Sequence, residues 1–283
     1  PLQKGDRVTW SSSLACGHCF YCKEKRQPTR CLNRKAYGIS YNCDEPPHCS
    51  GGYAEFIYLR PGTAIFKLDD QLSTECVIGA GCALVTAIHG IERMGLNWGD
   101  MVVIQGAGPV GLAALAVTLD HGASRVIVIG GPEERLKSAR RFGASECLNI
   151  EHLTSAEKRI QRVRELTRGY GADAVIECVG SPEVVPEAIE MCRDGAKFLV
   201  LGHYGDAGEV SINPHHITRK QLQLHGSWGS EHRHMAQALE FLRNQGGRFP
   251  FEELVTHRFP LDRVMEAIET TQKWQSTKSA VVP

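Results

Sequence analysis

The chain has 283 residues, which allows one large or two modest domains. Hydrophobic residues make up 42% and charged residues 23%, as in an ordinary soluble globular protein, and Lys+Arg and Asp+Glu balance at 32 each. The neutral balance argues against nucleic-acid binding, and because no run of about eighteen apolar residues lacks glycine and polar breaks, no membrane span is predicted.

The eleven cysteines are many for this length, and an odd number leaves at least one outside any disulfide framework. The sequence shows no signal peptide before them, and we expect none. Because structural disulfides persist in oxidising compartments, we expect these cysteines to be reduced and the protein to be cytoplasmic.

Four of the cysteines gather near the start of the chain, after a short strand predicted over 7–10. They follow the spacing C-x2-C-x2-C-x8-C, at Cys16, Cys19, Cys22 and Cys31. Two residues between ligands let a turn bring both sulfurs to one ion, and the longer loop brings in the fourth. Zinc in structural sites takes four ligands in a tetrahedron and favours thiolates. The pattern therefore predicts a structural zinc site, the alternative being four buried, reduced thiols.

Two further elements complete the first third of the chain. Residues 53–59 alternate in polarity and are rich in β-forming residues, which predicts a strand. From 73 to 94 the pattern becomes helical, with small and apolar residues dense around 77–91, and Asn97–Asp100 ends it.

The middle of the chain alternates between strand and helix. Strands are predicted at 101–105, 125–129, 147–150, 174–178, 197–201 and 222–224. Helices are predicted at 110–121, 132–142, 156–168 and 182–193. Fully apolar strands in such alternation favour a parallel sheet covered on both faces, so the predicted fold class is α/β with a doubly wound parallel sheet.

The first of these strands leads into a glycine-rich loop of the form G-x-G-x-x-G, followed by a helix, which is the context that dinucleotide binding requires. Gly106 permits the tight turn, Gly108 lets the backbone approach a pyrophosphate, and Gly111 lets the helix pack closely on the strand. With Pro109 and Val110 they form the candidate cofactor-binding loop. The helix N-terminus offers N–H groups and a partial positive charge to the phosphates.

The second strand lacks the acidic residue that selects NAD. About twenty residues after the glycines, an Asp or Glu is expected to accept the ribose hydroxyls. Gly130 stands there instead. A 2′-phosphate is then not repelled, and Arg135 is a candidate to approach it. Glu133 and Glu134 would oppose the phosphate or simply favour the helix N-terminus, so the choice between NAD and NADP stays open.

The tail is predicted to hold helices at 234–243 and 261–270 and strands at 254–257 and 279–282. It is too short to form a domain alone. We expect its last strand to pair back onto an N-terminal β domain.

Several motifs together resemble the zinc-dependent medium-chain alcohol dehydrogenases. Besides the cysteine pattern, the chain matches that family's G-D-R-V segment at 5–8, its G-G-Y-A-E-Y segment at 51–56, its cofactor loop at 106–111 and its next helix at 134–136. The resemblance runs from Gly5 to the end. It implies a partial GroES-like β domain with the zinc lobe at 1–83, a Rossmann dinucleotide-binding domain at 84–227, and a return to the first domain at 228–283.

The resemblance also implies a reaction, hydride transfer between an alcohol (a secondary alcohol or polyol) or the matching carbonyl and the nicotinamide of NAD or NADP. In the family, a catalytic zinc binds the alcohol oxygen, and one of its ligands is a cysteine in the helix that enters the nucleotide domain. Cys82 stands at that place, the alternative for it being a small buried helix residue. The alternative for the whole chain is a non-catalytic NAD(P)-binding protein that keeps the structural zinc but lacks a complete active site.

The chain departs from the family at its start. There the first ligand cysteine and a His-Glu pair lie upstream of the G-D-R-V segment, whereas this sequence begins at Pro1, just before it. We therefore expect the sequence to be a fragment of a longer protein, the alternative being a naturally shortened protein. By resemblance we also expect a homo-oligomer, dimer or tetramer, that acts on a small-molecule alcohol or carbonyl and has no nucleic-acid or membrane partner. The sequence does not identify the alcohol.

Overall fold

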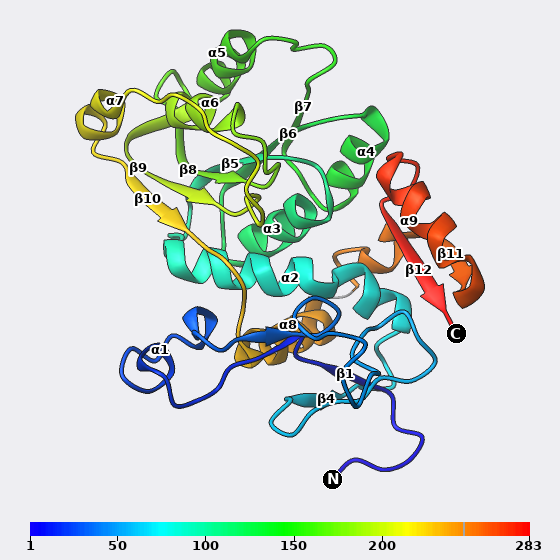
Figure 1. The fold of residues 1–283 in the computed structure, drawn as a ribbon. Coiled ribbons are helices and arrows are strands. Elements are labelled where there is room, and N and C mark those ends of the chain that lie inside the picture. Colours follow the sequence, from blue (N-terminus) through cyan, green and yellow to red (C-terminus); the bar gives the residue numbers. More distant parts are fainter. Residues whose placement is uncertain (246) are drawn as a thin grey trace. The chain divides into compact units, whose positions relative to one another are not determined.

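The structure, a computed structural model, describes residues 1–245 and 247–283. The backbone divides into two compact units. The central unit comprises Ala80–Trp228 and Gln245–Pro250, and the split unit comprises Pro1–Gly79, Gly229–Asn244 and Phe251–Pro283. Both ends of the chain belong to the split unit, as the blue and red segments of Figure 1 show.

A six-stranded parallel sheet forms the middle of the central unit (Figure 1). In spatial order its strands are β10 (Gln223–Gly226), β9 (Cys192–Val200), β8 (Ala172–Glu177), β5 (Met101–Gln105), β6 (Arg125–Gly130) and β7 (Glu146–Asn149). From β5 the chain moves outward through β6 and β7 and then returns to lay β8 on the other side of β5. The predicted doubly wound parallel sheet is confirmed, and its order reverses between β5 and β8.

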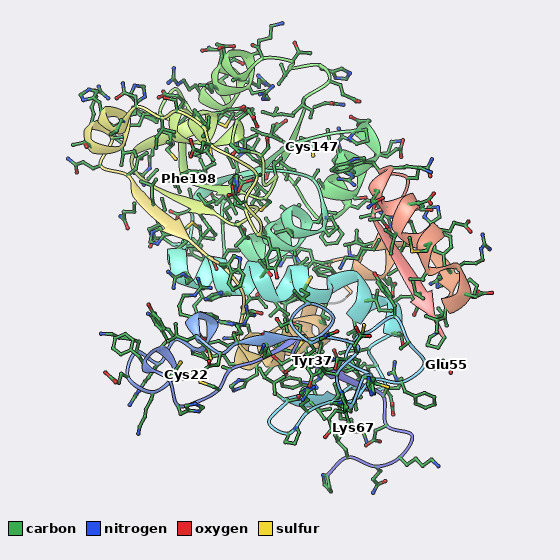
Figure 2. All side chains as sticks on the ribbon, viewed as in Figure 1. Cys22, Tyr37, Glu55, Lys67, Cys147 and Phe198 are labelled. Carbon is green, nitrogen blue, oxygen red and sulfur yellow. The ribbon has the colours of Figure 1, made fainter. Side chains whose placement is uncertain are left out.

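Helices pack on this sheet. They are α3 (Pro109–Asp120), α4 (Glu133–Arg141), α5 (Ala156–Leu166), α6 (Val184–Met191) and α7 (Pro214–Arg219). Helix α3 packs on β5 and β6, and α4 packs on β6 and β7. Helix α5 packs beside α6, where Ile160 and Val185 contact a core that includes Val103, Ile127 and Phe198, the last of these labelled in Figure 2. These three core residues are 0% exposed, as strands covered on both faces require.

Local sequence explains where two of these helices begin. Ser155 caps α5, because its hydroxyl accepts the N–H of Lys158. Asn213 caps α7 by accepting the N–H of His215, and Pro214 occupies the first helical position. Helix α7 has only six residues, too few to show a helical pattern in the sequence, and it is therefore not among the predicted helices.

Helix α2 (Thr74–Met94) confirms the helix predicted at 73–94, with one break. Gly81 has φ 45° and ψ −146°, which divides the helix into two segments. An added Cβ at Gly90 would stand 2.7 Å from a methyl carbon of Leu201, so this glycine permits a close approach. By length and composition α2 also matches a membrane span, a test that buried core helices pass as well, and 56% of its tested window is buried.

The first segment of the split unit holds short strands. Strand β1 (Val8–Trp10) pairs antiparallel with β4 (Ile65–Lys67), and β2 (Ser13–Leu14) pairs antiparallel with β3 (Lys35–Ala36). Between β2 and β3 lie α1 (Phe20–Lys23) and the 3-10 turn η1 (Pro28–Arg30). The strand predicted at 7–10 is therefore confirmed as β1.

The later segments of the split unit add helices and two longer strands. They contain α8 (His232–Gln245), η2 (Phe251–Leu254), β11 (Val255–Pro260), η3 (Leu261–Arg263), α9 (Val264–Gln272) and β12 (Lys278–Val282). Strand β12 pairs in parallel with β11, and α9 packs on both. The tail does return to the compact unit that contains Pro1–Gly79, as expected. Among the described residues the neighbour of its last strand is β11, and α9 provides the crossover that parallel neighbours need.

The strand predicted at 53–59 is wrong, because these residues are irregular. Tyr53 and Phe56 are 66% and 77% exposed. A strand needs a neighbour to take its backbone hydrogen bonds, and in the described part of the chain none is laid beside this segment. Instead, the N–H of Tyr58 donates to the carbonyl of Cys49 at 2.7 Å and closes a loop.

Candidate functional site

The four cysteines of the predicted metal site come together in the split unit. The sulfur atoms of Cys16, Cys19, Cys22 and Cys31, hereafter the cysteine cluster, all lie within 4.8 Å of one another (Cys22 is labelled in Figure 2). Tetrahedral zinc with Zn–S bonds of about 2.3 Å needs sulfurs roughly 3.8 Å apart. The donor set and its spacing therefore fit a four-thiolate zinc site.

Short turns produce this convergence. Gly17, at φ 77°, turns the chain between the first two cysteines. Cys19 is the N-cap of α1 and Cys22 follows three residues later, so the two sulfurs lie on one face, 3.5 Å apart. Cys31 ends η1, and its sulfur accepts the backbone N–H of Cys16 at 3.2 Å. The spacing read from the sequence thus has a direct structural counterpart.

Hydrogen bonding and burial affect these thiols unequally. A hydrogen bond from the backbone N–H of His18 lowers the pKa of Cys16 to about 5. The backbone N–H of Leu32 similarly lowers the pKa of Cys19. Burial, and after it the hydrogen bond with Cys19, raises the pKa of Cys22 to about 12. A cation at the centre of the cluster is therefore what allows all four sulfurs to be thiolates together.

The glycine loop lies in the central unit, at the carboxyl end of β5. The N–H of Gly106 donates to the carbonyl of Ile129 at 2.7 Å, which ties the loop to β6. An added Cβ at Gly111 would stand 1.9 Å from the carbonyl oxygen of Gly106, so only glycine permits the helix to start this close to the turn. Helix α3 begins at Pro109, directly after Gly108. This backbone shape fits the approach of a pyrophosphate to a helix N-terminus.

Packing explains the missing carboxylate at the end of β6. An added Cβ at Gly130 would stand 2.8 Å from the Cβ of Ala107, so the glycine loop leaves no room for a side chain there. Arg135 lies nearby, with its Nη1 3.8 Å from the Cβ position of Gly108. Burial lowers the pKa of Arg135 from its ordinary value. The candidate cation is thus placed beside the glycine at which a pyrophosphate approaches.

The acidic residues of α4 are engaged in ion pairs. Glu133 accepts from Arg140 at 2.6 Å and from the side-chain amide of Asn149 at 3.1 Å. Glu134 pairs with Lys137 at 2.7 Å. Their charges are therefore largely offset within the helix.

Cys82, the predicted ligand of a catalytic zinc, directly follows the break in α2 at Gly81 and is exposed. A catalytic zinc takes three protein ligands. Across residues 1–245 and 247–283, the cysteine cluster is the one group of three or more metal-ligating side chains, and it does not include Cys82. The described residues therefore do not complete a catalytic zinc site, and the role of Cys82 stays a prediction.

Glu177, the last residue of β8, is a buried carboxylate that is not among the residues predicted from the sequence. Its side chain is 0% exposed and accepts backbone N–H groups from two different loops. The available signal is a carboxylate directly after the apolar run Ala174–Ile176, because a charge buried there needs compensating partners.

Comparisons with known proteins find matches in the segment with the cysteine cluster and in the segment that begins at α3. Residues 1–70 match the alcohol dehydrogenase GroES-like domain, and residues 109–244 match the zinc-binding dehydrogenase domain. The 5-exo-hydroxycamphor dehydrogenase of Pseudomonas putida is 32% identical over 272 residues, which cover 95% of this chain and 73% of that protein. D-arabinitol dehydrogenase 1 of Uromyces fabae is 28% identical over 100% of this chain and 76% of its own. The crystal structure of an alcohol dehydrogenase from Thermotoga maritima matches with a TM-score of 0.94 at 32% identity, covering 100% of this chain and 77% of that chain.

Proposed function

Because this chain belongs to the zinc-dependent medium-chain alcohol dehydrogenases, we propose that it transfers a hydride between a secondary alcohol or polyol and the nicotinamide of NAD or NADP. The broader class, a zinc-dependent NAD(P)-linked oxidoreductase acting on alcohols, follows from the family. The names of two relatives, a hydroxycamphor and an arabinitol dehydrogenase, support the finer choice of substrate.

The glycine loop is the observation that carries this proposal. The loop and the N-terminus of α3 offer backbone N–H groups and a partial positive charge to the cofactor phosphates. Gly106 and Gly111 hold the turn and the helix close enough together that no side chain obstructs the approach. NAD(P), when bound, supplies the hydride acceptor or donor. The role of these residues is to bind and orient the dinucleotide.

The cysteine cluster would hold the structural zinc. Four thiolates complete a tetrahedron and leave no position for substrate, so this metal stabilises the fold. We assign Cys82 to a second zinc as one of its ligands, on the family resemblance and its exposed position after Gly81. Since the described residues do not supply the other ligands, we derive no reaction step through that metal.

Alcohol-dependent reduction of NAD+ and NADP+, tested with a panel of secondary alcohols and polyols, tests the proposal. We expect NADH or NADPH to form with at least one substrate class. The incomplete ligand set around Cys82 favours a second candidate, a non-catalytic NAD(P)-binding protein. One zinc per chain, cofactor binding and no turnover in either direction would establish that candidate instead.

We further propose that the protein works in the cytoplasm and as a homo-oligomer, a dimer or a tetramer. None of the eleven cysteines is joined in a disulfide, which supports a reducing compartment. Strand β10 is an edge of the central sheet, and Leu224 on it, with Val210 and Ile212 before it, is partly exposed. An apolar sheet edge supports pairing with a second copy. A monomer mass by light scattering would contradict the oligomer.

A further inference from the structure

Glu177 is a buried carboxylate that joins two loops at the carboxyl edge of the central sheet. Its Oε1 accepts the backbone N–H groups of Val179 and Gly180, both at 2.6 Å. Its Oε2 accepts the N–H of Gly202 at 3.1 Å, and the same N–H also donates to the backbone carbonyl of Glu177 at 3.0 Å. Hydrogen bonds to an ionised acceptor are about twice as strong as neutral ones, so these contacts compensate for burial of the charge.

The loops joined by Glu177 pack backbone against backbone around the switch point of the sheet. An added Cβ at Gly180 would stand 2.6 Å from the carbonyl oxygen of Gly202. The N–H of Cys178 donates to the carbonyl of Gln105 at 2.8 Å, and the Cβ position of Gly106 lies 3.1 Å from the carbonyl of Cys178. The glycine loop after β5 and the loops after β8 and β9 therefore form one continuous edge.

Topology places this edge relative to the cofactor. In a doubly wound sheet the dinucleotide crosses the switch point, with its pyrophosphate at the glycine loop. The ribose of the adenosine half belongs at the end of β6, where Gly130 lies. The nicotinamide half then belongs on the other side of β5, against the loops after β8 and β9.

We propose that Glu177 is a positioning residue for the cofactor, because its carboxylate fixes these two loops so that their peptide groups face the nicotinamide half in one geometry. The inference rests on the proposed function, since NAD(P) is the ligand. His203 supports it. Its Nε2 is buried, makes no hydrogen bond within the described residues, and lies 3.8 Å from the carboxylate of Glu177. The loop after β9 thus also places a buried ring nitrogen beside the carboxylate that holds it.

Glu177→Gln tests the proposal through binding. Glutamine keeps the size of the side chain, but its NH2 group is a donor and cannot accept a backbone N–H. If it replaces Oε1, the N–H groups of Val179 and Gly180 lose their acceptor. If it replaces Oε2, the N–H of Gly202 keeps only the backbone carbonyl of Glu177. We expect NADH and NADPH to bind about ten-fold more weakly, which corresponds to about 1.4 kcal/mol. ADP-ribose, which lacks the nicotinamide, should lose no more than about two-fold in the same titration.

Glu187→Gln is the matched control, because Glu187 is a second buried carboxylate of the central unit, paired with Arg159 at 2.7 Å. It should lower the unfolding temperature and leave the ratio of the NADH and ADP-ribose affinities unchanged. Equal losses for both ligands in Glu177→Gln would overturn the positioning role.

Glu177→Asp, which keeps the charge on a shorter stem, takes the same test if the glutamine variant does not fold. An unchanged affinity ratio there, or failure of both variants to fold, assigns the carboxylate to stability alone and overturns the inference. A wild-type protein that binds neither NADH, NADPH nor ADP-ribose would instead overturn the proposed function.

Discussion

The strands of the central sheet are four to nine residues long, whereas the strands in the first segment of the split unit are two or three residues long. The central strands bury apolar residues such as Val103 and Phe198 completely. Between Pro1 and Gly79, the buried hydrophobic residues are few and half of them are cysteines, namely Cys31, Leu68, Leu72 and Cys76. A packed core thus suffices for the central unit, whereas we expect the first segment to depend on the zinc proposed for the cysteine cluster, because its apolar core is small.

Removal of the zinc should cause the largest loss of stability, and this loss should fall on the first segment of the split unit and not on the central unit. Cys22→Ser takes one thiolate from the cysteine cluster. Structural zinc contributes on the order of 10–16 kcal/mol of apparent binding energy in small zinc domains. We expect the variant to lose its zinc and to become sensitive to protease in the first segment, while the central unit keeps its cooperative unfolding. Metal analysis and limited proteolysis with mass spectrometry measure both.

Cys43→Ser provides the matched control for this prediction. Cys43 is exposed, lies in the same segment and is outside the cysteine cluster. This variant should keep the zinc and the protease resistance of the wild type. Equal zinc content in Cys22→Ser and wild type would contradict the assignment of the cluster as the metal site.

Gly111→Ala should be the most damaging single change in the central unit. The new Cβ would stand 1.9 Å from the backbone oxygen of Gly106, so α3 must move away from the glycine loop. We expect a loss of about 1–3 kcal/mol in the free energy of unfolding. The displaced loop should weaken NADH binding roughly 100-fold, equivalent to about 2.7 kcal/mol. Gly226→Ala is the control, because no atom lies within 4 Å of the Cβ position of Gly226. An NADH affinity near that of the wild type in Gly111→Ala would contradict the assignment of the glycine loop as the pyrophosphate site.

The two units also differ in how well their elements are predicted from the sequence. The strands of the central sheet and the loop from Gly106 to Gly111 follow from local pattern, because apolar runs and glycine spacing specify their own geometry. Residues 53–59 alternate like a strand, yet pairing depends on a neighbour that the pattern does not contain. Glu177 stays hidden for the same reason, since its partner Gly202 lies 25 residues further along the chain. Long-range partners are what a local pattern lacks.

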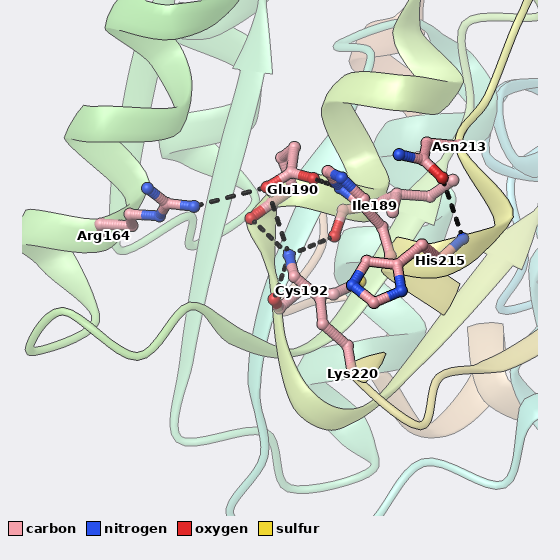
Figure 3. A network of polar contacts seen from close by, with 8 residues as sticks. Arg164, Ile189, Glu190, Cys192, Asn213, His215 and Lys220 are labelled. Carbon is pink, nitrogen blue, oxygen red and sulfur yellow. Dashed lines mark hydrogen bonds and ion pairs between the residues drawn. The ribbon is translucent and has the colours of Figure 1, made fainter. Parts of the chain in front are cut away.

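Substitution of Lys220 should cause a smaller loss of stability, confined to the central unit. Its ammonium donates to the carbonyls of Ile189, Glu190 and Cys192 at 2.8, 3.2 and 3.3 Å and so satisfies the end of α6 (Figure 3). Lys220→Met keeps the aliphatic stem and removes these bonds, which should cost about 1.5–3 kcal/mol in chemical denaturation. Lys273→Met, in an exposed pair, should change stability by less than about 1 kcal/mol. Equal denaturation midpoints for the two variants would refute the role of Lys220.

The same network predicts a pH dependence. Burial opposes ionisation of Glu190, but the hydrogen bond with His216 and the charge of Lys220 outweigh it, so the pKa of Glu190 falls below its ordinary 4.5. A carboxyl with a lowered pKa in the folded state contributes stability above its unfolded pKa and loses it as pH falls through the folded pKa. The stability difference between wild type and Lys220→Met should therefore shrink as pH falls below 4.5. A constant difference across denaturation curves at several pH values would contradict this coupling.

Substitution of Arg135 should have the smallest effect, a change in the relative affinities for NADPH and NADH. Its Nη1 lies 3.8 Å from the Cβ position of Gly108, and Glu133 is engaged by Arg140. Because a 2′-phosphate adds up to about two negative charges, Arg135→Ala should weaken NADPH binding about ten-fold and NADH binding about two-fold. Arg162→Ala, in an exposed pair, should change neither affinity. Equal losses for NADPH and NADH would place the guanidinium on the pyrophosphate that both cofactors share, so the choice between them would rest on other groups of the central unit.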